Sequence, residues 1–211
     1  MNEILLAIFQ FVVFMFSAIV HEVSHGLAAY KLGDDTAKQM GRLSLDPRKH
    51  LDPFGSLLLP LFLLIVRSPV LFGWAKPVPY NPANLKNPKI GAALIGLAGP
   101  TSNILLAIIF GILIRVLAVS FGPKIAAFLI MLNVIVFINI MLAIFNLVPI
   151  PPLDGSKLLF AVLPYKYYRL QNALETYGGV ILLFFIFFGF QIIIPLIEFV
   201  YKLIVGPYGF I

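Results

Sequence analysis

Two histidines and a glutamate lie within an apolar stretch that runs from Ile4 to Tyr30. Residues four apart share one face of a helix, so His21 and His25 can direct a ring nitrogen at the same metal ion, with Glu22 about 100° around the same turn. This is the HExxH pattern, which supplies two metal ligands and a general base. Ionisable groups at membrane depth cost about a few kcal/mol each and usually line a cavity or pathway. The motif therefore predicts a metal centre inside the membrane.

The alternative for this cluster is structural: two histidines that hydrogen-bond between helices beside a neutralised glutamate. Polar residues at membrane depth are functional by default, which favours the metal centre. The third histidine of the chain, His50, has no set of ligands near it in the sequence. We therefore expect His50 to be a hydrated loop residue.

The composition is that of an integral membrane protein. Of the 211 residues, 61% are hydrophobic and 11% are charged, against about 45–50% and about 25% in soluble domains. The absence of cysteine excludes disulfides, thiolate catalysis and cysteine-ligated zinc. The net charge of +6 comes from short loops beside apolar spans, where basic residues set topology. We therefore expect contact with the lipid bilayer and no nucleic-acid partner.

Long apolar helices must position the motif. Four transmembrane helices are expected, at Ile4–Lys31, Ile90–Leu117, Lys124–Val148 and Tyr177–Leu203. The last should be kinked or broken near Pro195. Phe54–Tyr80 is expected to form a short helix followed by a re-entrant or extended segment, and Met40–Leu45 a short β-hairpin. The predicted fold is thus an all-α polytopic membrane protein in one domain, 1–211, with a catalytic core at 1–155 and C-terminal membrane helices at 156–211.

A zinc hydrolase needs three protein ligands and an open fourth position. The best candidate for the third ligand is Asp154, which follows the third predicted span and precedes Gly155. Pro149, Pro151 and Pro152 must end the helix there and hold an irregular backbone near the metal, while Gly155 permits a close approach.

The distribution of basic residues predicts which way the site opens. If the first helix runs from outside to inside, only Arg67, Arg115, Lys124 and Lys202 of the 15 basic residues lie outside or near that face. Cytoplasmic loops carry the excess of Lys and Arg. We therefore expect a site that opens toward the cytoplasm.

The chain resembles the site-2 proteases, a family of intramembrane zinc metalloproteases. The resemblance rests on HEVSHG at His21–Gly26, GLAGPTSN at Gly96–Asn103 and FNLVPIPPLDG at Phe145–Gly155. LDPRKHLDPFG at Leu45–Gly55 and FGWAKPVPYNP at Phe72–Pro82 match further stretches typical of the family. No PDZ-like or nucleotide-sensing domain is recognisable, so the match is to the minimal members.

The resemblance implies a zinc-dependent endopeptidase of a prokaryotic cell membrane, which cuts transmembrane protein substrates near the cytoplasmic face in regulated intramembrane proteolysis. One Zn²⁺ per chain would be held by His21, His25 and Asp154, and Glu22 would take a proton from the attacking water and deliver it to the leaving amine.

An amide side chain would stabilise the oxyanion of the reaction. Asn146 is the first choice and Asn103 the second, with a hydrogen bond between helices as an equal alternative for either. Asn139 is assigned to packing, with support of the site as its further use.

Substrate would be bound by β-augmentation, because a helix must unwind before it exposes its amides. The expected contact residues are Gly73, Trp74, Ala75, Lys76, Pro77, Val78 and Pro79.

Other classes stay open. A metal transporter would also place His and Asp in spans, but with repeated halves and a polar path across the membrane. Another class of intramembrane HExxH protease takes a Glu as third ligand, for which Glu175 and Glu198 are the late candidates. A catalytically inactive homologue that binds membrane proteins is the last alternative.

Overall fold

The computed structural model of the chain describes residues 3–52 and 76–210, and four positions between them, Gly55, Leu58, Phe62 and Ile65. The described part is helical or irregular and contains no strand. Its α-helices are α1 (Glu3–Lys31), α2 (Thr36–Gln39), α4 (Pro88–Phe121), α5 (Ala126–Asn146), α6 (Asp154–Val162), α7 (Tyr168–Phe184) and α8 (Ile194–Val205). Its shorter helical turns are η1 (Pro47–Lys49), η3 (Pro82–Asn84), η4 (Gly122–Ile125), η5 (Tyr165–Tyr167), the π-helical η6 (Phe185–Gly189), η7 (Phe190–Ile192) and η8 (Gly206–Tyr208).

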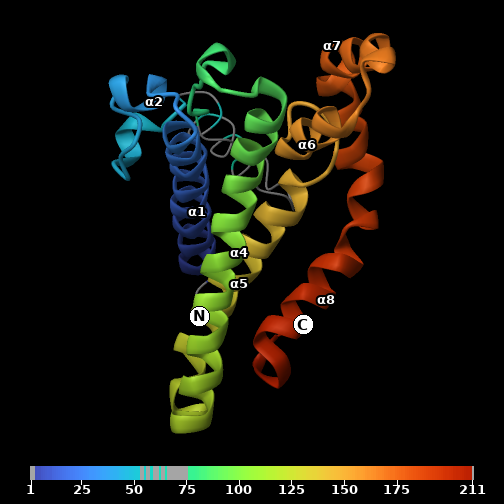
Figure 1. Cartoon of the computed structure of the whole chain (residues 1–211). Coiled ribbons are helices and arrows are strands. Elements are labelled where there is room, and N and C mark those ends of the chain that lie inside the picture. The colour runs from blue at the N-terminus through green and yellow to red at the C-terminus, as the bar shows by residue number, and fades with distance from the viewer. Residues whose placement is uncertain are drawn as a thin grey trace.

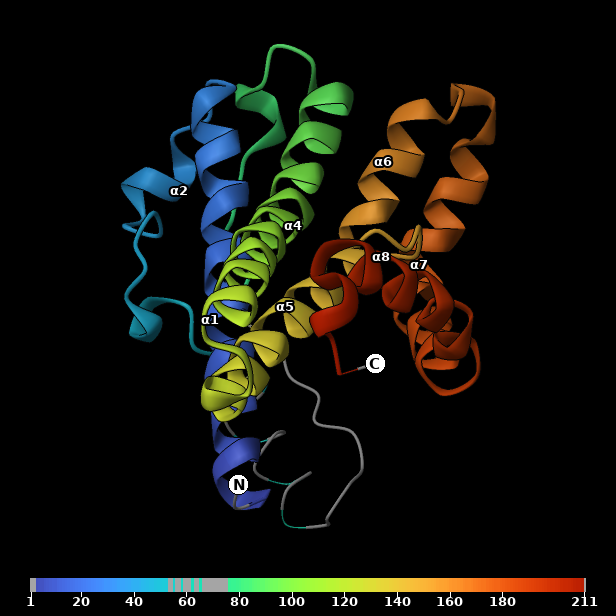
Figure 2. The same cartoon turned by 90° about the horizontal axis from the view of Figure 1, so that it is seen from below.

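Helices α1, α4 and α5 lie side by side as the central bundle, and α4 and α5 run antiparallel (Figures 1 and 2). Helices α2 and α6 and the start of α7 gather at one end of this bundle, and α8 runs back toward the other end (Figure 1). The turn between α4 and α5 begins at Gly122, whose φ of 57° suits a residue without a side chain. The start of α4 is capped by Asn87, whose side chain accepts a hydrogen bond from the Ile90 N–H.

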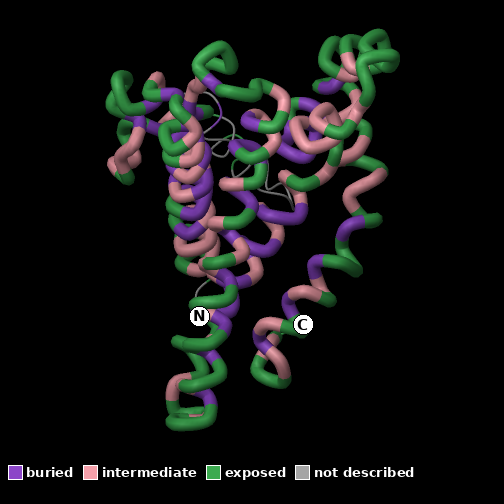
Figure 3. The backbone as a smooth tube through the Cα atoms, in the orientation of Figure 1, coloured by how far each residue is buried: buried purple, intermediate pink, exposed green. Residues whose placement is uncertain are grey.

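Three apolar clusters hold the described part of the bundle together. The largest joins α4, α5 and α8 around fully buried Ile114, Ile140 and Tyr201. The others join α1 to α5 through Val13 and Ile138, and α1 to α4 through Ala29 and Ile95. Buried positions face the interior of the bundle, while the outer faces of α4, α7 and α8 are exposed (Figure 3). These outer faces carry large apolar side chains, as a lipid-facing surface does.

Three helical runs in the described residues are long and apolar enough to cross a membrane: Glu3–Lys31, Pro88–Asn146 and Tyr165–Ile192. The middle run consists of α4 and α5, which correspond to the second and third predicted spans. The fourth predicted span, Tyr177–Leu203, is interrupted by η6 and η7. The expected break near Pro195 is confirmed, because α8 starts at Ile194 with that proline in its first turn.

The predicted β-hairpin at Met40–Leu45 is absent from the structure. Met40 and Gly41 instead complete a turn after α2, in which the Arg42 N–H donates to the Ala37 carbonyl oxygen at 2.9 Å. Gly41 has a φ of 65°, which turns the chain out of a strand path. The predicted short helix at Phe54–Val66 and the expected re-entrant stretch before Lys76 lie largely outside the described residues.

Candidate metal centre

Three predicted ligands meet at one point between α1 and the start of α6. The Nε2 atoms of His21 and His25 lie 3.0 Å and 3.1 Å from the same oxygen, Oδ2 of Asp154. All three side chains are buried, and one ligand atom from each lies within 4.8 Å of the others. Residues up to 133 positions apart in the chain thus form a single compact cluster.

The hydrogen bonds behind the two imidazoles fix which nitrogen faces the cluster. Nδ1 of His21 lies 2.6 Å from Oδ1 of Asn103, and Nδ1 of His25 lies 2.6 Å from the carbonyl oxygen of Ile95. Both partners are acceptors, so each Nδ1 carries the hydrogen, and a neutral ring then directs the lone pair of its Nε2 inward. Two lone pairs and a carboxylate oxygen facing one another suit a bound cation, and the set is one that zinc uses.

The orientation of Asn103 is itself determined by a buried network. Its Nδ2 donates to Oδ1 of Asn139 at 2.9 Å and to the Ser17 carbonyl oxygen at 3.3 Å. Nδ2 of Asn139 donates in turn to Oγ of Ser17 at 3.0 Å. With its nitrogen used in this way, Asn103 must present its oxygen to His21. The structure therefore places Asn103 behind a predicted ligand, and Asn139 supports that placement.

Glycines of α4 let the helix approach the cluster closely. A Cβ on Gly99 would lie 2.5 Å from Nε2 of His21 and 2.6 Å from Cε1 of His25. A Cβ on Gly96, one turn earlier, would lie 3.1 Å from the backbone oxygen of Asp154. In the sequence these glycines stand out only as part of the GLAGPTSN stretch. The signal that could have revealed their role is the three-residue spacing, which places both on the face toward the ligands.

Asp154 is held by its position as well as by its partners. It occupies the first turn of α6, where the helix dipole favours a negative charge. Nζ of Lys157 lies 2.8 Å from Oδ1 of Asp154, so the lysine takes one carboxylate oxygen and Oδ2 remains for the histidines. Gly155 allows the tight preceding turn, because a Cβ there would overlap the Leu147 carbonyl oxygen.

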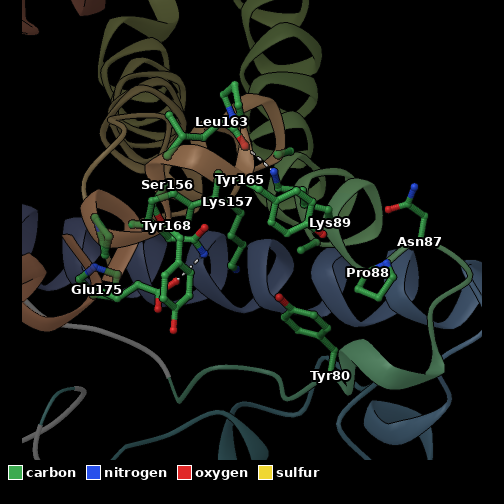
Figure 4. A pocket seen from close by; sticks show the side chains of 17 residues that line it. Tyr80, Asn87, Pro88, Lys89, Ser156, Lys157, Leu163, Tyr165, Tyr168 and Glu175 are labelled. Carbon is green, nitrogen blue, oxygen red and sulfur yellow. Dashed lines mark hydrogen bonds between the residues drawn. The ribbon is translucent and has the colours of Figure 1, made fainter. Parts of the chain in front are cut away.

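A cavity of about 780 Å³ adjoins the cluster at Lys157. It lies between α6, the start of α4 and the start of α7, and Tyr80, Lys89 and Tyr168 project into it (Figure 4). The ammonium of Lys157 lies 5.8 Å from the centre of the Tyr80 ring. The volume of this cavity falls in the usual range for ligand sites, about 300–1,000 Å³.

Glu22 lies beside the cluster and is partly exposed. Its Oε2 accepts a hydrogen bond of 2.8 Å from the backbone N–H of Val78. Val78 belongs to the predicted substrate-contact segment, of which Gly73, Trp74 and Ala75 lie outside the described residues. Lys76, Pro77, Val78 and Pro79 have irregular backbone.

The remaining candidates do not join the cluster. Nδ2 of Asn146 donates to the Leu142 carbonyl oxygen of its own helix at 2.9 Å. Glu175 lines the cavity and accepts a hydrogen bond from Gln171, and Oε2 of Glu198 lies 3.8 Å from Nζ of Lys202.

The expectation for His50 is wrong. Its side chain is fully buried, and Nε2 donates to the Ser44 carbonyl oxygen at 2.6 Å inside the loop.

Comparison with known proteins identifies relatives. The family model described as peptidase family M50 matches residues 122–188. The Bacillus subtilis protein named "Putative zinc metalloprotease YwhC" is 40% identical over 79% of this chain and 74% of its own length. The Mycobacterium tuberculosis (strain H37Rv) protein named "Putative zinc metalloprotease Rip2" is 32% identical over 66% of this chain and 51% of its own length. No solved structure matches the chain significantly.

Three observations agree with one another: relatives named as zinc metalloproteases, a His, His and Asp group that could hold a metal ion, and helical runs apolar enough to cross a membrane. A relative that is 40% identical over 74% of its length is sufficient to show the family. The chain belongs to peptidase family M50, the site-2 proteases, and is a zinc metalloprotease of the membrane.

Proposed function

We propose that this protein is an intramembrane endopeptidase in which His21, His25 and Asp154 bind the catalytic zinc and Glu22 is the general base. The observation that carries the proposal is the convergence of two imidazole lone pairs and the carboxylate oxygen of Asp154, beside a second carboxylate, that of Glu22, which Val78 holds separately. Zinc bound there would polarise the scissile carbonyl and lower the pKa of water to about 7.

The side chains divide the remaining work. Asn103 and the Ile95 carbonyl hold the rings of His21 and His25 in the tautomer that presents Nε2. Glu22 is bound through one oxygen to Val78, which leaves the other oxygen to accept the proton of the attacking water. Glu22 then delivers that proton to the amine nitrogen as the peptide bond breaks, so no net proton is gained or lost by the enzyme.

For the oxyanion we retain Asn146 as the proposed amide donor. Asn103 is the weaker candidate, because both its oxygen and its nitrogen are engaged in the network behind His21. Asn146 would have to release only the Leu142 carbonyl of its own helix, a local rotation. A donor of this kind contributes about 10²–10³ in rate.

Water would reach the site from the cytoplasmic side. The cavity beside Lys157 lies at the end of the bundle where α2 and α6 gather. This end carries Lys38, Lys89 and Lys166, while Arg115 and Lys124 lie at the opposite end of α4. Cytoplasmic segments carry the excess of basic residues, which supports a site open to the cytoplasm and four crossings, by α1, α4, α5 and the broken run α7–α8.

Transmembrane proteins are the proposed substrates, and we keep Gly73–Pro79 as the proposed contact segment. Residues 76–79 of this segment are described, and their two backbone N–H groups are both bonded within the protein. The Lys76 N–H donates to the His50 carbonyl oxygen, and the Val78 N–H donates to Glu22. Substrate pairing along Lys76–Pro79 would therefore use carbonyl oxygens, with N–H groups supplied by the unwound substrate. The carbonyl oxygens of Lys76 and Pro77 already accept hydrogen bonds from Arg42, so those of Val78 and Pro79 are the proposed acceptors.

The test is cleavage of single-span substrates by the detergent-purified protein, with zinc measured on each variant. Glu22→Gln should retain zinc and lose cleavage, because the neutral amide cannot accept a proton. Asp154→Asn should lose zinc, because only the carboxylate completes the ligand set. Glu175→Gln, a matched change at an exposed acid, should behave as the wild type.

Three results would contradict the proposal. Cleavage by the Glu22→Gln variant would remove Glu22 as the base. If changing Glu175 removed zinc and changing Asp154 did not, Glu175 would be the third ligand in place of Asp154. A zinc-loaded wild type that cuts no span in a broad panel would favour an inactive homologue or a metal-transport protein.

A further inference from the structure

The loop after α2 contains two buried polar residues that the proposed chemistry leaves unused. Arg42 is 8% exposed and His50 is fully buried. They lie at the start and the end of the stretch that forms η1, and part of this stretch matches the family pattern LDPRKHLDPFG. Burial of a permanent positive charge is costly unless it is well bonded, so the partners of Arg42 indicate what it does.

The guanidinium group of Arg42 binds three backbone carbonyl groups. Nη2 donates to the carbonyl oxygen of Lys76 at 2.8 Å and to that of Pro77 at 3.1 Å, and Nη1 donates to the carbonyl oxygen of Lys49. On the other side of the same segment, the Lys76 N–H donates to the carbonyl oxygen of His50 at 2.8 Å. The planar fork of Arg thus fastens residues 76 and 77 to the loop that carries it.

This fastened segment leads directly to Glu22. Pro77 and Pro79 have no N–H group, so Val78 supplies the one backbone donor among residues 77–79. That donor binds Oε2 of Glu22 at 2.8 Å. Val78 is itself buried against α1, because a Cβ on Gly26 would lie 2.9 Å from its Cγ1. Arg42, the two peptide groups it binds and Val78 therefore form a continuous connection to the carboxylate.

We propose that Arg42 is a positioning residue for the general base: it fixes the backbone of Lys76 and Pro77 so that the Val78 N–H holds Glu22 in one orientation for proton transfer. This proposal rests on the proposed function of Glu22. An unheld glutamate has three rotatable side-chain bonds, and a misplacement of about 1 Å at a reacting group can cost about 10²-fold in rate. Arg42 contacts neither the predicted ligands nor the reacting atoms. Because it acts through the orientation of Glu22, its effect should appear in the rate of the chemical step.

The experiment compares Arg42→Lys and Arg42→Ala with the wild type in kcat, KM, bound zinc and thermal unfolding temperature. The Lys ammonium carries the charge but lacks the planar fork, so R42K should lower kcat about tenfold and R42A about 100-fold. Bound zinc should stay near the wild-type value, and KM, which also reports on the proposed substrate contact at Lys76–Pro79, should change less than kcat. The matched control is Arg48→Ala in the same loop, because the Arg48 side chain is 87% exposed and pairs only locally with Asp46. It should leave kcat unchanged.

Each other outcome has a distinct meaning. Wild-type kcat in R42K and R42A would overturn the positioning role while leaving the protease mechanism intact. A fall in zinc content or unfolding temperature that parallels the fall in kcat in R42K would overturn it in favour of a role in folding alone. If R42A does not fold, R42K decides. A wild type that does not cleave, or a Glu22→Gln variant that does, would instead contradict the proposed function.

Discussion

At the scale of single residues, the cluster depends on the lack of a side chain at Gly99 as well as on the hydrogen bonds to the two imidazoles. Gly99 faces both imidazoles at a distance where any side chain would overlap them. The hydrogen bonds to Asn103 and Ile95 hold the same rings from behind. Each ring is therefore confined on two sides, which is the preorganisation that a metal ligand requires.

Gly99→Ala should abolish or strongly weaken zinc binding, because its Cβ would occupy the space 2.5 Å from Nε2 of His21. The measurement is the zinc content and zinc affinity of the purified variant. Gly179→Ala is the control, because a Cβ at that helical position meets nothing within 4 Å. Full zinc binding by the Gly99→Ala variant would show that the rings can shift without loss of the site.

The residues that form the cluster were predictable, and what supports them was predictable only in part. A hydrogen bond between helices was an alternative for Asn103, and support of the site was the further use given for Asn139. His21, Glu22, His25 and Asp154 were predicted as one group, and the structure brings the three predicted ligands together. Gly99 and Asn103 act through contacts between α1 and α4, which depend on the rotation of one helix against another. Spacing within one helix shows which residues share a face, but not which neighbour that face meets.

At the scale of elements, Asp34 ties the end of α1 to the segment before α4. Its fully buried carboxylate accepts hydrogen bonds from the Asn81 N–H at 2.8 Å, from Nδ2 of Asn84 at 2.7 Å and from both N–H and Oγ1 of Thr36. Burial by itself raises the pKa of Asp34, but the hydrogen bonds from Thr36, Asn81 and Asn84 outweigh it, and the pKa lies below its ordinary value of 3.8.

This depressed pKa predicts a pH dependence of stability. The stabilisation is fully present above about pH 4, the ordinary pKa of Asp, and is lost as the pH falls below it through the folded-state pKa. Asp34→Asn should lower the unfolding temperature at pH 7 and flatten its fall between about pH 5 and pH 3. The measurement is thermal unfolding in detergent at these pH values. Asp35→Asn, at an exposed neighbour that binds Gln39, should follow the wild type. A curve for the Asp34→Asn variant that parallels the wild type would contradict this assignment.

Among the elements, the long apolar spans were predictable and the irregular ones were not. Continuous hydropathy located α1, α4 and α5 to within a few residues. The helix α6 follows the proline-rich turn and has only nine residues, which is too short for periodicity to detect. The hairpin expected at Met40–Leu45 failed because the short turn there is followed by Arg42, whose bonds go to other segments.

At the scale of the whole molecule, polar contacts secure both ends of the bundle. The cluster of His21, His25 and Asp154 and the Asp34 contacts lie at one end. At the other, Nε of Arg115 donates to the Ile204 carbonyl oxygen at 2.8 Å, and the Tyr201 hydroxyl donates to Oδ1 of Asn133. These contacts bind α8 to α4 and α5 and leave its outer face exposed. The broken run α7–α8 is thus anchored to α4 and α5 at its far end.

This arrangement predicts a topology that labelling can check. Because the chain has no cysteine, single cysteines introduced at Lys38, Lys166 and Lys124 report position without background. We expect a membrane-impermeant maleimide to label the first two from the cytoplasmic side and the third from outside, as the excess of basic residues at the α2 and α6 end requires. Labelling of the cysteine introduced at Lys38 from outside would reverse the orientation and place the cavity on the outer face.

The predicted ligands are divided between α1 and α6, and this limits the directions from which a substrate helix can reach them. Helix α1 carries two of the three predicted ligands and packs on both α4 and α5, so swinging it aside would take the site apart. Helix α7 carries no predicted ligand and has Gly178 as its one buried residue. We therefore expect that, if a substrate helix enters from the side of the bundle, α7 moves to admit it and α1 stays in place.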